Sequence, residues 1–219
     1  MDASYFLTSI YPLQDSVLGA LSGVDTGFYL SGGTAASRAY LNHRFSEDLD
    51  LFVNDDPAFP LWSQRSIAAL NGLPQATVQV VVNDPRFVRV VVSQHEIAVK
   101  VEFINDVPGH VGPIRFHPVL GRVDSAENIL ANKITALLDR REPKDLADIW
   151  AFVTRLGLSI EASISGAQTK AAGVFPPDVA RGLLSVSRPD WALVRWVSAP
   201  EFETYVHDLR RIGEGLLGL

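Results

Sequence analysis

The sequence predicts an α+β fold in which a mixed sheet with flanking helices is followed by a C-terminal helical region. Three observations favour it. Two apolar runs and a Gly-Gly turn between residues 28 and 53 indicate a strand, a helix and a second strand. Three further β-rich runs occupy residues 77–104, and helical spacing dominates from residue 124 onward. We therefore expect an α/β core at residues 1–122 and a helical region at residues 123–219 that completes a cleft with it.

Composition limits the class of protein. The chain has 219 residues, of which 47% are hydrophobic, so it can bury a core as one domain or two small ones. It has no cysteine, which removes disulfides and thiolate metal sites. No apolar run has the length of a membrane span and the N-terminus lacks a basic signal region, so we expect a cytoplasmic protein without a membrane partner. The net charge of −6 argues against sequence-independent binding to long nucleic acid and leaves a local basic patch or a folded RNA partner open.

The expected elements of the core follow from apolar spacing and turn residues. Apolar side chains recur at helical intervals across residues 4–21, and again from Pro60 to a stop at Asn71-Gly72. Turn sequences at 83–85 and 93–95 separate three β-rich runs, which we expect to form an antiparallel meander beside the first two strands. The expected helices lie at 4–21, 34–43 and 60–70, and the expected strands at 28–30, 48–53, 77–82, 87–92 and 96–104.

The C-terminal region carries successive helix signals. Asp124-Ser125-Ala126-Glu127 is typical of a capping box, and it opens a helix that we expect to reach Asp139. Pro143 suits the first turn of the next helix. Weaker helical patterns follow at 160–172 and after Pro176. A closing amphipathic helix is expected at 201–217, in a last layer packed by Trp191, Trp196, Phe202 and Tyr205.

The segment from residue 31 to residue 52 carries the strongest chemical signal. Asp48 and Asp50 stand two residues apart on an expected strand, so both carboxylates point to one face. Mg²⁺, or Mn²⁺ in its place, prefers such hard oxygen ligands and is held by one or two carboxylates plus substrate phosphates. Gly32 and Gly33 have no Cβ, so backbone N–H groups at a helix start can approach an anion. Each half alone is more often a plain turn or a solvated strand.

These motifs together resemble a known family. Gly-Gly-Thr, a short helix and Arg-x-Ser-x-Asp-Leu-Asp-Leu-Phe resemble the minimal nucleotidyltransferases of the DNA polymerase β-like superfamily, and among them the AbiEii/AbiGii toxins of type IV toxin–antitoxin pairs. The resemblance spans residues 27–153 and implies a polymerase-β-like mixed sheet. It implies that Asp48 and Asp50 hold the metal. It also implies a nucleotide site that includes Ser31, Gly32, Gly33, Thr34, Arg44 and Ser46, although Arg44 alternatively anchors its loop.

Three downstream residues match further motifs of this resemblance. Glu102 matches the third carboxylate of the metal site, and an exposed Lys/Glu face on an edge strand is its structural alternative. Lys133 lies in the apolar arc of its helix and matches a lysine that neutralises triphosphate, although such a side chain also reaches the rim of a core for structural reasons. Asp145 matches the fourth motif, yet an Asp in a first helical turn stabilises it by about 0.3–1 kcal/mol without any chemistry.

The resemblance implies a Mg²⁺-dependent nucleotidyltransferase with NTP as its substrate. It would move a nucleoside monophosphate to an acceptor, either RNA such as tRNA or a protein, and would pair with a cognate antitoxin. The main alternative is a non-catalytic module that binds nucleotide or a partner on the same fold. Glycosyltransferases and haloacid-dehalogenase phosphatases also use Asp-x-Asp, but the former have no counterpart of the Gly-Gly turn. The latter have an apolar strand where this chain has Arg44-Phe45-Ser46-Glu47.

Overall fold

The computed structural model describes residues 3–218, which divide into two compact units. The first unit contains the chain up to Ala35, Phe45–Pro108 and Ile114–Asp124, and it carries every strand of the sheet in the described part of the chain. The second contains Ala36–Arg44, Gly109–Pro113 and the chain from Ser125 onward, and its named elements are helical. The mixed sheet, its flanking helices and the C-terminal helices confirm the predicted α+β class.

The sheet of the first unit has seven strands in the order β3-β4-β5-β2-β1-β7-β6. Strands β3, β4 and β5 form the expected antiparallel meander, and β5 lies beside β2 in parallel orientation. Strand β1 pairs antiparallel with β2 and parallel with β7, so the sheet is mixed. The strands are β1 Tyr29–Ser31, β2 Leu49–Asn54, β3 Ala76–Asp84, β4 Phe87–Gln94, β5 Ile97–Asp106, β6 Arg115–His117 and β7 Gly121–Val123.

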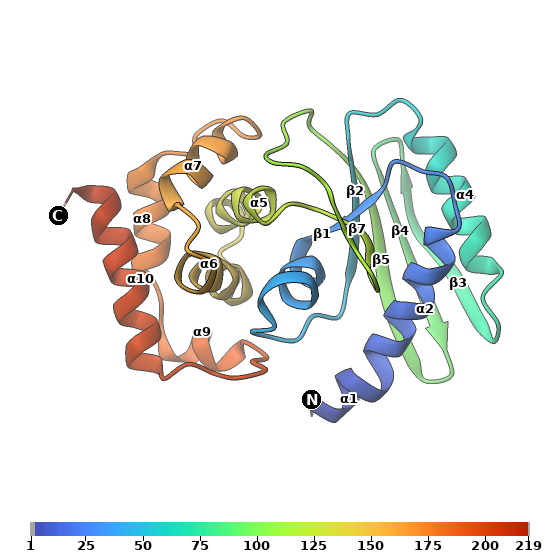
Figure 1. Ribbon diagram of the computed structural model, residues 1–219, viewed down its shortest axis with the longest axis horizontal. Coiled ribbons are helices and arrows are strands. Elements are labelled where there is room, and N and C mark those ends of the chain that lie inside the picture. The colour runs from blue at the N-terminus through green and yellow to red at the C-terminus, as the bar shows by residue number, and fades with distance from the viewer. Residues whose placement is uncertain (1–2, 219) are drawn as a thin grey trace. The chain divides into compact units, whose positions relative to one another are not determined.

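Two helices of the first unit, α2 (Tyr11–Ser22) and α4 (Phe59–Asn71), pack against each other over the sheet (Figure 1). The helix expected at 4–21 begins with α1 (Ala3–Tyr5) and a π-helical turn, η1 (Phe6–Ile10), before α2. Strand β2 alternates as predicted, with Leu49, Leu51 and Val53 buried and the intervening residues half-buried. This alternation leaves Asp50, Phe52 and Asn54 on the other, half-buried face of β2.

The helix expected at 34–43 begins two residues earlier and has a different geometry. It starts as α3 (Gly32–Thr34), continues as a π-helix, η2 (Ala35–Leu41), and ends before His43. A π-helix is rare and often occurs at functional sites because its wider turn redirects side chains. Strand β2 also starts one residue later than predicted, so Asp48 lies just before the strand and not within it.

The second unit is built around α5 (Ala126–Asp139), which contacts three other helices of that unit. These are α6 (Pro143–Leu156), α7 (Ile160–Gln168) and α8 (Pro176–Leu184); α9 (Arg188–Leu193) and α10 (Phe202–Leu217) follow them. Helix α10 runs along α8 and also contacts α6 (Figure 1). The aromatic layer expected near the C-terminus is present, since Trp150, Trp191, Trp196, Phe202 and Tyr205 contact one another.

The N-cap of α5 differs from the expected one. Ser125, not Asp124, is the cap, because its side chain accepts a hydrogen bond from the backbone N–H of Asn128. Asp124 is fully buried in the first unit and accepts a hydrogen bond from Ser31 instead. None of the helices in residues 3–218 combines the length and apolarity that a membrane crossing requires.

Candidate functional site

Three predicted acidic residues of the first unit lie close together, Asp50 on β2, Glu102 on β5 and Asp48 just before β2. In the parallel pair of β2 and β5, Asp50 is the register partner of Glu102, and Leu49 is the partner of Val101. Asp48 is two residues before Asp50, so it shares the face of the sheet that Asp50 and Glu102 occupy. The sheet therefore brings Glu102 beside Asp48 and Asp50, from which it is distant in the sequence.

Two basic side chains contact these carboxylates. Lys100 Nζ lies 3.1 Å from Asp48 Oδ2 and 3.2 Å from Glu102 Oε1. Arg89 of β4 donates from Nε to the same Glu102 oxygen at 2.7 Å. Burial alone would lower the pKa of Lys100, but the Asp48 and Glu102 carboxylates raise that pKa above its ordinary value. Lys100 is therefore a cation when it bridges the two acids.

Gly32 contacts the acidic strand directly. Its φ of +64° lies in the left-handed region that glycine adopts without steric cost. A Cβ built at Gly32 would lie 2.1 Å from Asp50 Oδ2, a distance that no real Cβ contact allows. Glycine at this position therefore lets the Asp50 carboxylate pack against the turn that opens α3.

The hydroxyl groups of the motif make internal hydrogen bonds. Ser31 Oγ donates to Asp124 Oδ2 at 2.6 Å, and both side chains are fully buried. Thr34 Oγ1 donates to the backbone carbonyl of Asp48 and lies 3.0 Å from Ser46 Oγ. These bonds hold the segment before β2 against the start of α3, so they position Asp48. A phosphate contact from Ser31, Thr34 or Ser46 stays a prediction.

The donor set fits a divalent ion held by Asp48 and Asp50. Their carboxylates are hard oxygen ligands on one face of the sheet, and Mg²⁺ needs only one or two of them when substrate phosphates supply the rest. The turn at Gly32 lets the Asp50 carboxylate approach the backbone. In residues 3–218 no group of three or more His, Cys, Asp or Glu side chains is arranged to hold a metal. The assignment of Glu102 as a third ligand stays a prediction.

The second unit holds a buried network centred on Asp148. Arg44 binds this carboxylate through two nitrogens, with Nε at 2.6 Å and Nη2 at 2.7 Å. His43 Nε2 lies 2.8 Å from Asp148 Oδ1, and Lys133 Nζ lies 2.7 Å from Asp148 Oδ2. Burial alone would raise the pKa of Asp148, but Arg44 and Lys133 hold that pKa well below its ordinary value. Arg44 therefore makes the anchoring contact that was its alternative role.

Asp145 joins the same network. It accepts from Lys133 Nζ at 2.9 Å and from Arg140 Nε at 2.9 Å. Burial would raise the pKa of Asp145, while Lys133 and Arg140 together lower it. Lys133, only 5% exposed, thus lies between two buried aspartates that raise its pKa against the effect of burial. Its predicted contact with triphosphate requires a change in these ion pairs.

The sequence analysis assigns no role to four residues of these two clusters. Lys100 is expected only on the polar face that it shares with Glu102, and Arg89 has no assignment, since a strand pattern does not show which carboxylate lies on the next strand. His43 has no assignment either, although it directly precedes Arg44. Asp148 ends the Lys-Asp-Leu-x-Asp run in which Asp145 is the predicted site residue, and it has three ionic partners where Asp145 has two.

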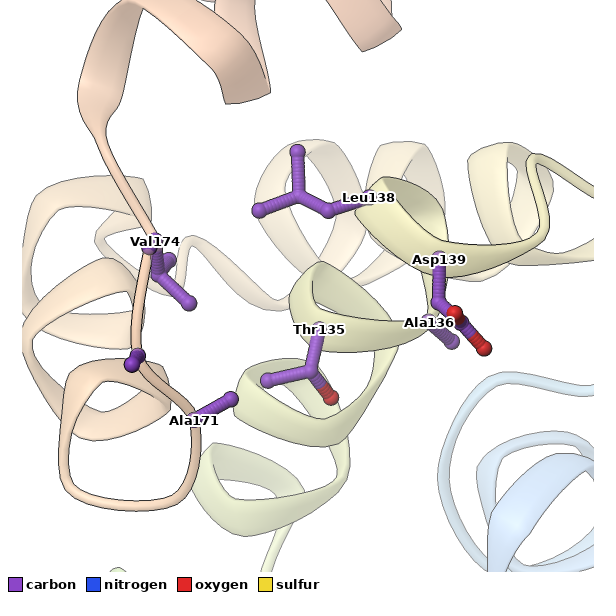
Figure 2. Close-up of a pocket in the computed structure, with 8 residues that line it drawn as sticks. Thr135, Ala136, Leu138, Asp139, Ala171 and Val174 are labelled. Carbon is purple, nitrogen blue, oxygen red and sulfur yellow. The ribbon is translucent and has the colours of Figure 1, made fainter.

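Two pockets lie away from these clusters. One, of about 490 Å³, lies between the C-terminal half of α5 and residues 171–174 of the second unit. Figure 2 shows Thr135 and Leu138 of α5 facing it, with Val174 opposite. Asp139 is its single ionisable residue, so this pocket has no cation for a triphosphate. The other, of about 390 Å³, is largely apolar and is formed by the first unit near Phe28 and Arg122.

Comparison with known proteins decides the family. The sequence profile described as nucleotidyl transferase AbiEii toxin, type IV TA system, matches residues 16–188. The chain belongs to the AbiEii family. The matched range includes the glycine turn, both strand aspartates, Glu102, and the Lys133 and Asp148 network. Membership confirms the predicted resemblance, and it places the chain among nucleotidyltransferase toxins of toxin–antitoxin systems.

Solved structures share the fold. The nucleotidyltransferase toxin MenT4 from Mycobacterium tuberculosis is 18% identical with a TM-score of 0.66, and the match covers 96% of this chain and 83% of that one. A proposed nucleotidyltransferase from H. pylori is 17% identical with a TM-score of 0.63, covering 99% and 96%. JHP933 from Helicobacter pylori is 18% identical with a TM-score of 0.59, covering 95% and 90%. None of the curated protein sequences matches the chain.

Proposed function

We propose that this AbiEii-family chain transfers a nucleoside monophosphate from an NTP to an acceptor, with RNA such as tRNA as the first candidate and protein as the second. The observation that carries the proposal is the contact of the Gly32 turn with Asp50, beside its register partner Glu102. A glycine turn that packs against a strand with carboxylate side chains can bind a phosphate and a divalent ion side by side. Phosphoryl-type transfer depends on such positioning and charge neutralisation more than on covalent chemistry.

Each residue would then have a defined task. Asp48 and Asp50 would hold Mg²⁺, or Mn²⁺, which when bound neutralises the phosphate oxygens of the NTP. The backbone of Gly32 and Gly33 would bind the phosphates, and Glu102 would serve the acceptor side. The acceptor oxygen bonds to the α-phosphorus as the bond from that phosphorus to the bridging oxygen breaks. Pyrophosphate leaves, and the proton of the acceptor hydroxyl goes to a nearby base.

The test is incubation of the purified chain with each α-³²P-labelled NTP, Mg²⁺, and either total RNA or a protein mixture. We expect labelled acceptor and released pyrophosphate, and we expect Asp50→Asn to abolish both while the melting temperature stays near that of the wild type. Glu127→Gln, which changes a carboxylate of α5 outside both clusters, is the matched control. Full transfer by Asp50→Asn would show that the strand aspartates are not the catalytic pair.

One observation favours a second candidate, a nucleotide- or partner-binding module without catalysis. Glu102 already accepts from Arg89 and lies 3.2 Å from Lys100, so the acidic cluster is partly neutralised by the chain's own cations. Isothermal titration separates the two candidates. NTP binding without pyrophosphate release, whichever acceptor is present, supports the binding module.

As a type IV family member the chain is also proposed to have an antitoxin partner. Co-expression with the neighbouring gene product, followed by measurement of growth, would test this.

A further inference from the structure

Lys100 occupies a particular place in the acidic cluster of the first unit. Its ammonium lies within 3.2 Å of one oxygen of Asp48 and one oxygen of Glu102, which come from two different segments of the chain. The Lys100 side chain is 35% exposed, and that of Glu102 is 13% exposed. The Lys100 ammonium bridges the two carboxylates. A metal ion bound by the same two carboxylates would occupy the position that this ammonium now has.

The sheet fixes this arrangement. Asp50 pairs with Glu102 and Leu49 with Val101, and the residues just before these two, Asp48 and Lys100, contact each other through their side chains. Lys100 and Glu102 are two residues apart on β5 and share one face. On the other side of β5, Arg89 of β4 is the register partner of Glu102 and donates to it. The pairing of β5 with a strand on each side therefore brings Lys100 close to Asp48 and Glu102, and the contact does not depend on the side-chain rotamer alone.

We propose that Lys100 is a built-in cation that competes with a divalent metal ion for Asp48 and withholds Glu102 from it. The inference rests on the proposed function in so far as a metal ion is expected at Asp48 and Asp50. An ammonium and a divalent ion repel each other strongly at a separation of a few ångströms. Asp48 therefore exchanges Lys100 for the metal, and Lys100 moves away from the carboxylate when the metal enters. Lys100 is thus a positioning residue, because it acts on the metal ion through the carboxylates of Asp48 and Glu102.

The closest alternative is a purely structural ion pair. In that case Lys100 would only hold the edge of β5 to the segment before β2, and its loss would lower stability without any effect on metal binding. Exposed and half-exposed ion pairs contribute little to stability. Metal affinity therefore separates the two readings better than a melting temperature does.

The first experiment measures Mn²⁺ binding to the full chain without NTP or acceptor, by electron paramagnetic resonance of the free ion. We expect Lys100→Met to bind Mn²⁺ about tenfold more tightly than the wild type, because the competing charge is gone. Adding Glu102→Gln to Lys100→Met should remove most of that gain, since Glu102 is the carboxylate that the lysine releases. Lys144→Met, which removes the exposed pair with Glu142, is the matched control and should leave the affinity unchanged. Equal affinity of folded Lys100→Met and wild type overturns the proposal.

The second experiment uses the unmodified chain and stays decisive if Lys100→Met does not fold. Acetylation of each lysine by acetic anhydride is followed by mass spectrometry with and without saturating Mn²⁺. We expect Mn²⁺ to increase the labelling rate of Lys100 several-fold and to leave that of Lys144 unchanged. An unchanged or reduced rate at Lys100 overturns the proposal. A chain that passes both tests but transfers no nucleotide would refute the proposed function and keep this inference.

Discussion

The Asp50 carboxylate occupies the space where a side chain at Gly32 would begin, since a Cβ there would lie 2.1 Å from Asp50 Oδ2. The contact joins two features that lie almost twenty positions apart in sequence, the glycine turn that opens α3 and the half-buried face of β2. The positive φ of Gly32 is a second, independent reason for glycine at this position. A substitution at Gly32 therefore tests the geometry of the whole motif.

Gly32→Ala is expected to abolish nucleotide transfer, because the new Cβ must displace the Asp50 carboxylate. The left-handed backbone adds a cost of about 1–2 kcal/mol for alanine. The measurement is label transfer together with urea denaturation. Gly19→Ala in α2 is the matched control, since no atom lies within 4 Å of its Cβ, and it should leave transfer unchanged. Transfer at the wild-type rate by Gly32→Ala would refute the role of this contact.

Asp148→Asn is expected to lower the free energy of unfolding by about 3–5 kcal/mol, because it leaves buried cations of Arg44 and Lys133 without their shared anion. Urea denaturation measures the change. Glu203→Gln, which removes the exposed pair with Arg188, should change the free energy by less than about 1 kcal/mol. If both variants change the free energy of unfolding equally, the Asp148 network stabilises the fold less than its burial predicts.

His43 predicts a loss of stability toward mildly acidic pH. Burial lowers the pKa of His43 below its ordinary value, so the imidazole stays neutral in the folded chain while the unfolded chain takes up a proton. Unfolding is therefore favoured as the pH falls below about 6.5, the ordinary pKa of histidine, and the stabilisation is complete above it. The lowered pKa of Asp148 acts only at lower pH, since its contribution is lost as the pH falls through a value below about 3.9.

The measurement is the free energy of unfolding at about pH 7.5 and about pH 5.5. We expect His43→Gln to reduce the difference between the two values, although it is less stable than the wild type at both. His207→Gln replaces an exposed histidine of α10 and should keep the wild-type difference. If His43→Gln shows the same difference between the two pH values as the wild type, groups other than His43 cause the loss of stability in acid.

Lys133→Met is expected to weaken NTP affinity about tenfold if Lys133 leaves its aspartate partners to neutralise triphosphate, as the family motif implies. It should also lower stability, since Asp145 and Asp148 both contact its ammonium. Isothermal titration below the melting temperature separates the two effects, with Lys144→Met as the control. A stable Lys133→Met chain with unchanged affinity would restrict Lys133 to the buried network.

The sequence was sufficient for the elements with strong local signals. The meander was predicted because turn residues such as Asn83-Asp84-Pro85 separate runs of alternating apolar side chains. Helix α6 was predicted from Pro143 at its start and its apolar stripe. The helix after Gly33 was predicted with the wrong geometry, because propensity does not distinguish an α-helix from a π-helix.

What the sequence by itself determined is the family, the strand–helix–strand order around Gly32, and the pair of carboxylates at Asp48 and Asp50, because residue type and spacing are local properties. What only the tertiary structure decided is which charges meet. The register of β2 on β5 brings Lys100 between Asp48 and Glu102, and the folding of the second unit brings His43, Arg44 and Lys133 to Asp148. Such contacts join residues up to about a hundred positions apart, and no local pattern contains that information.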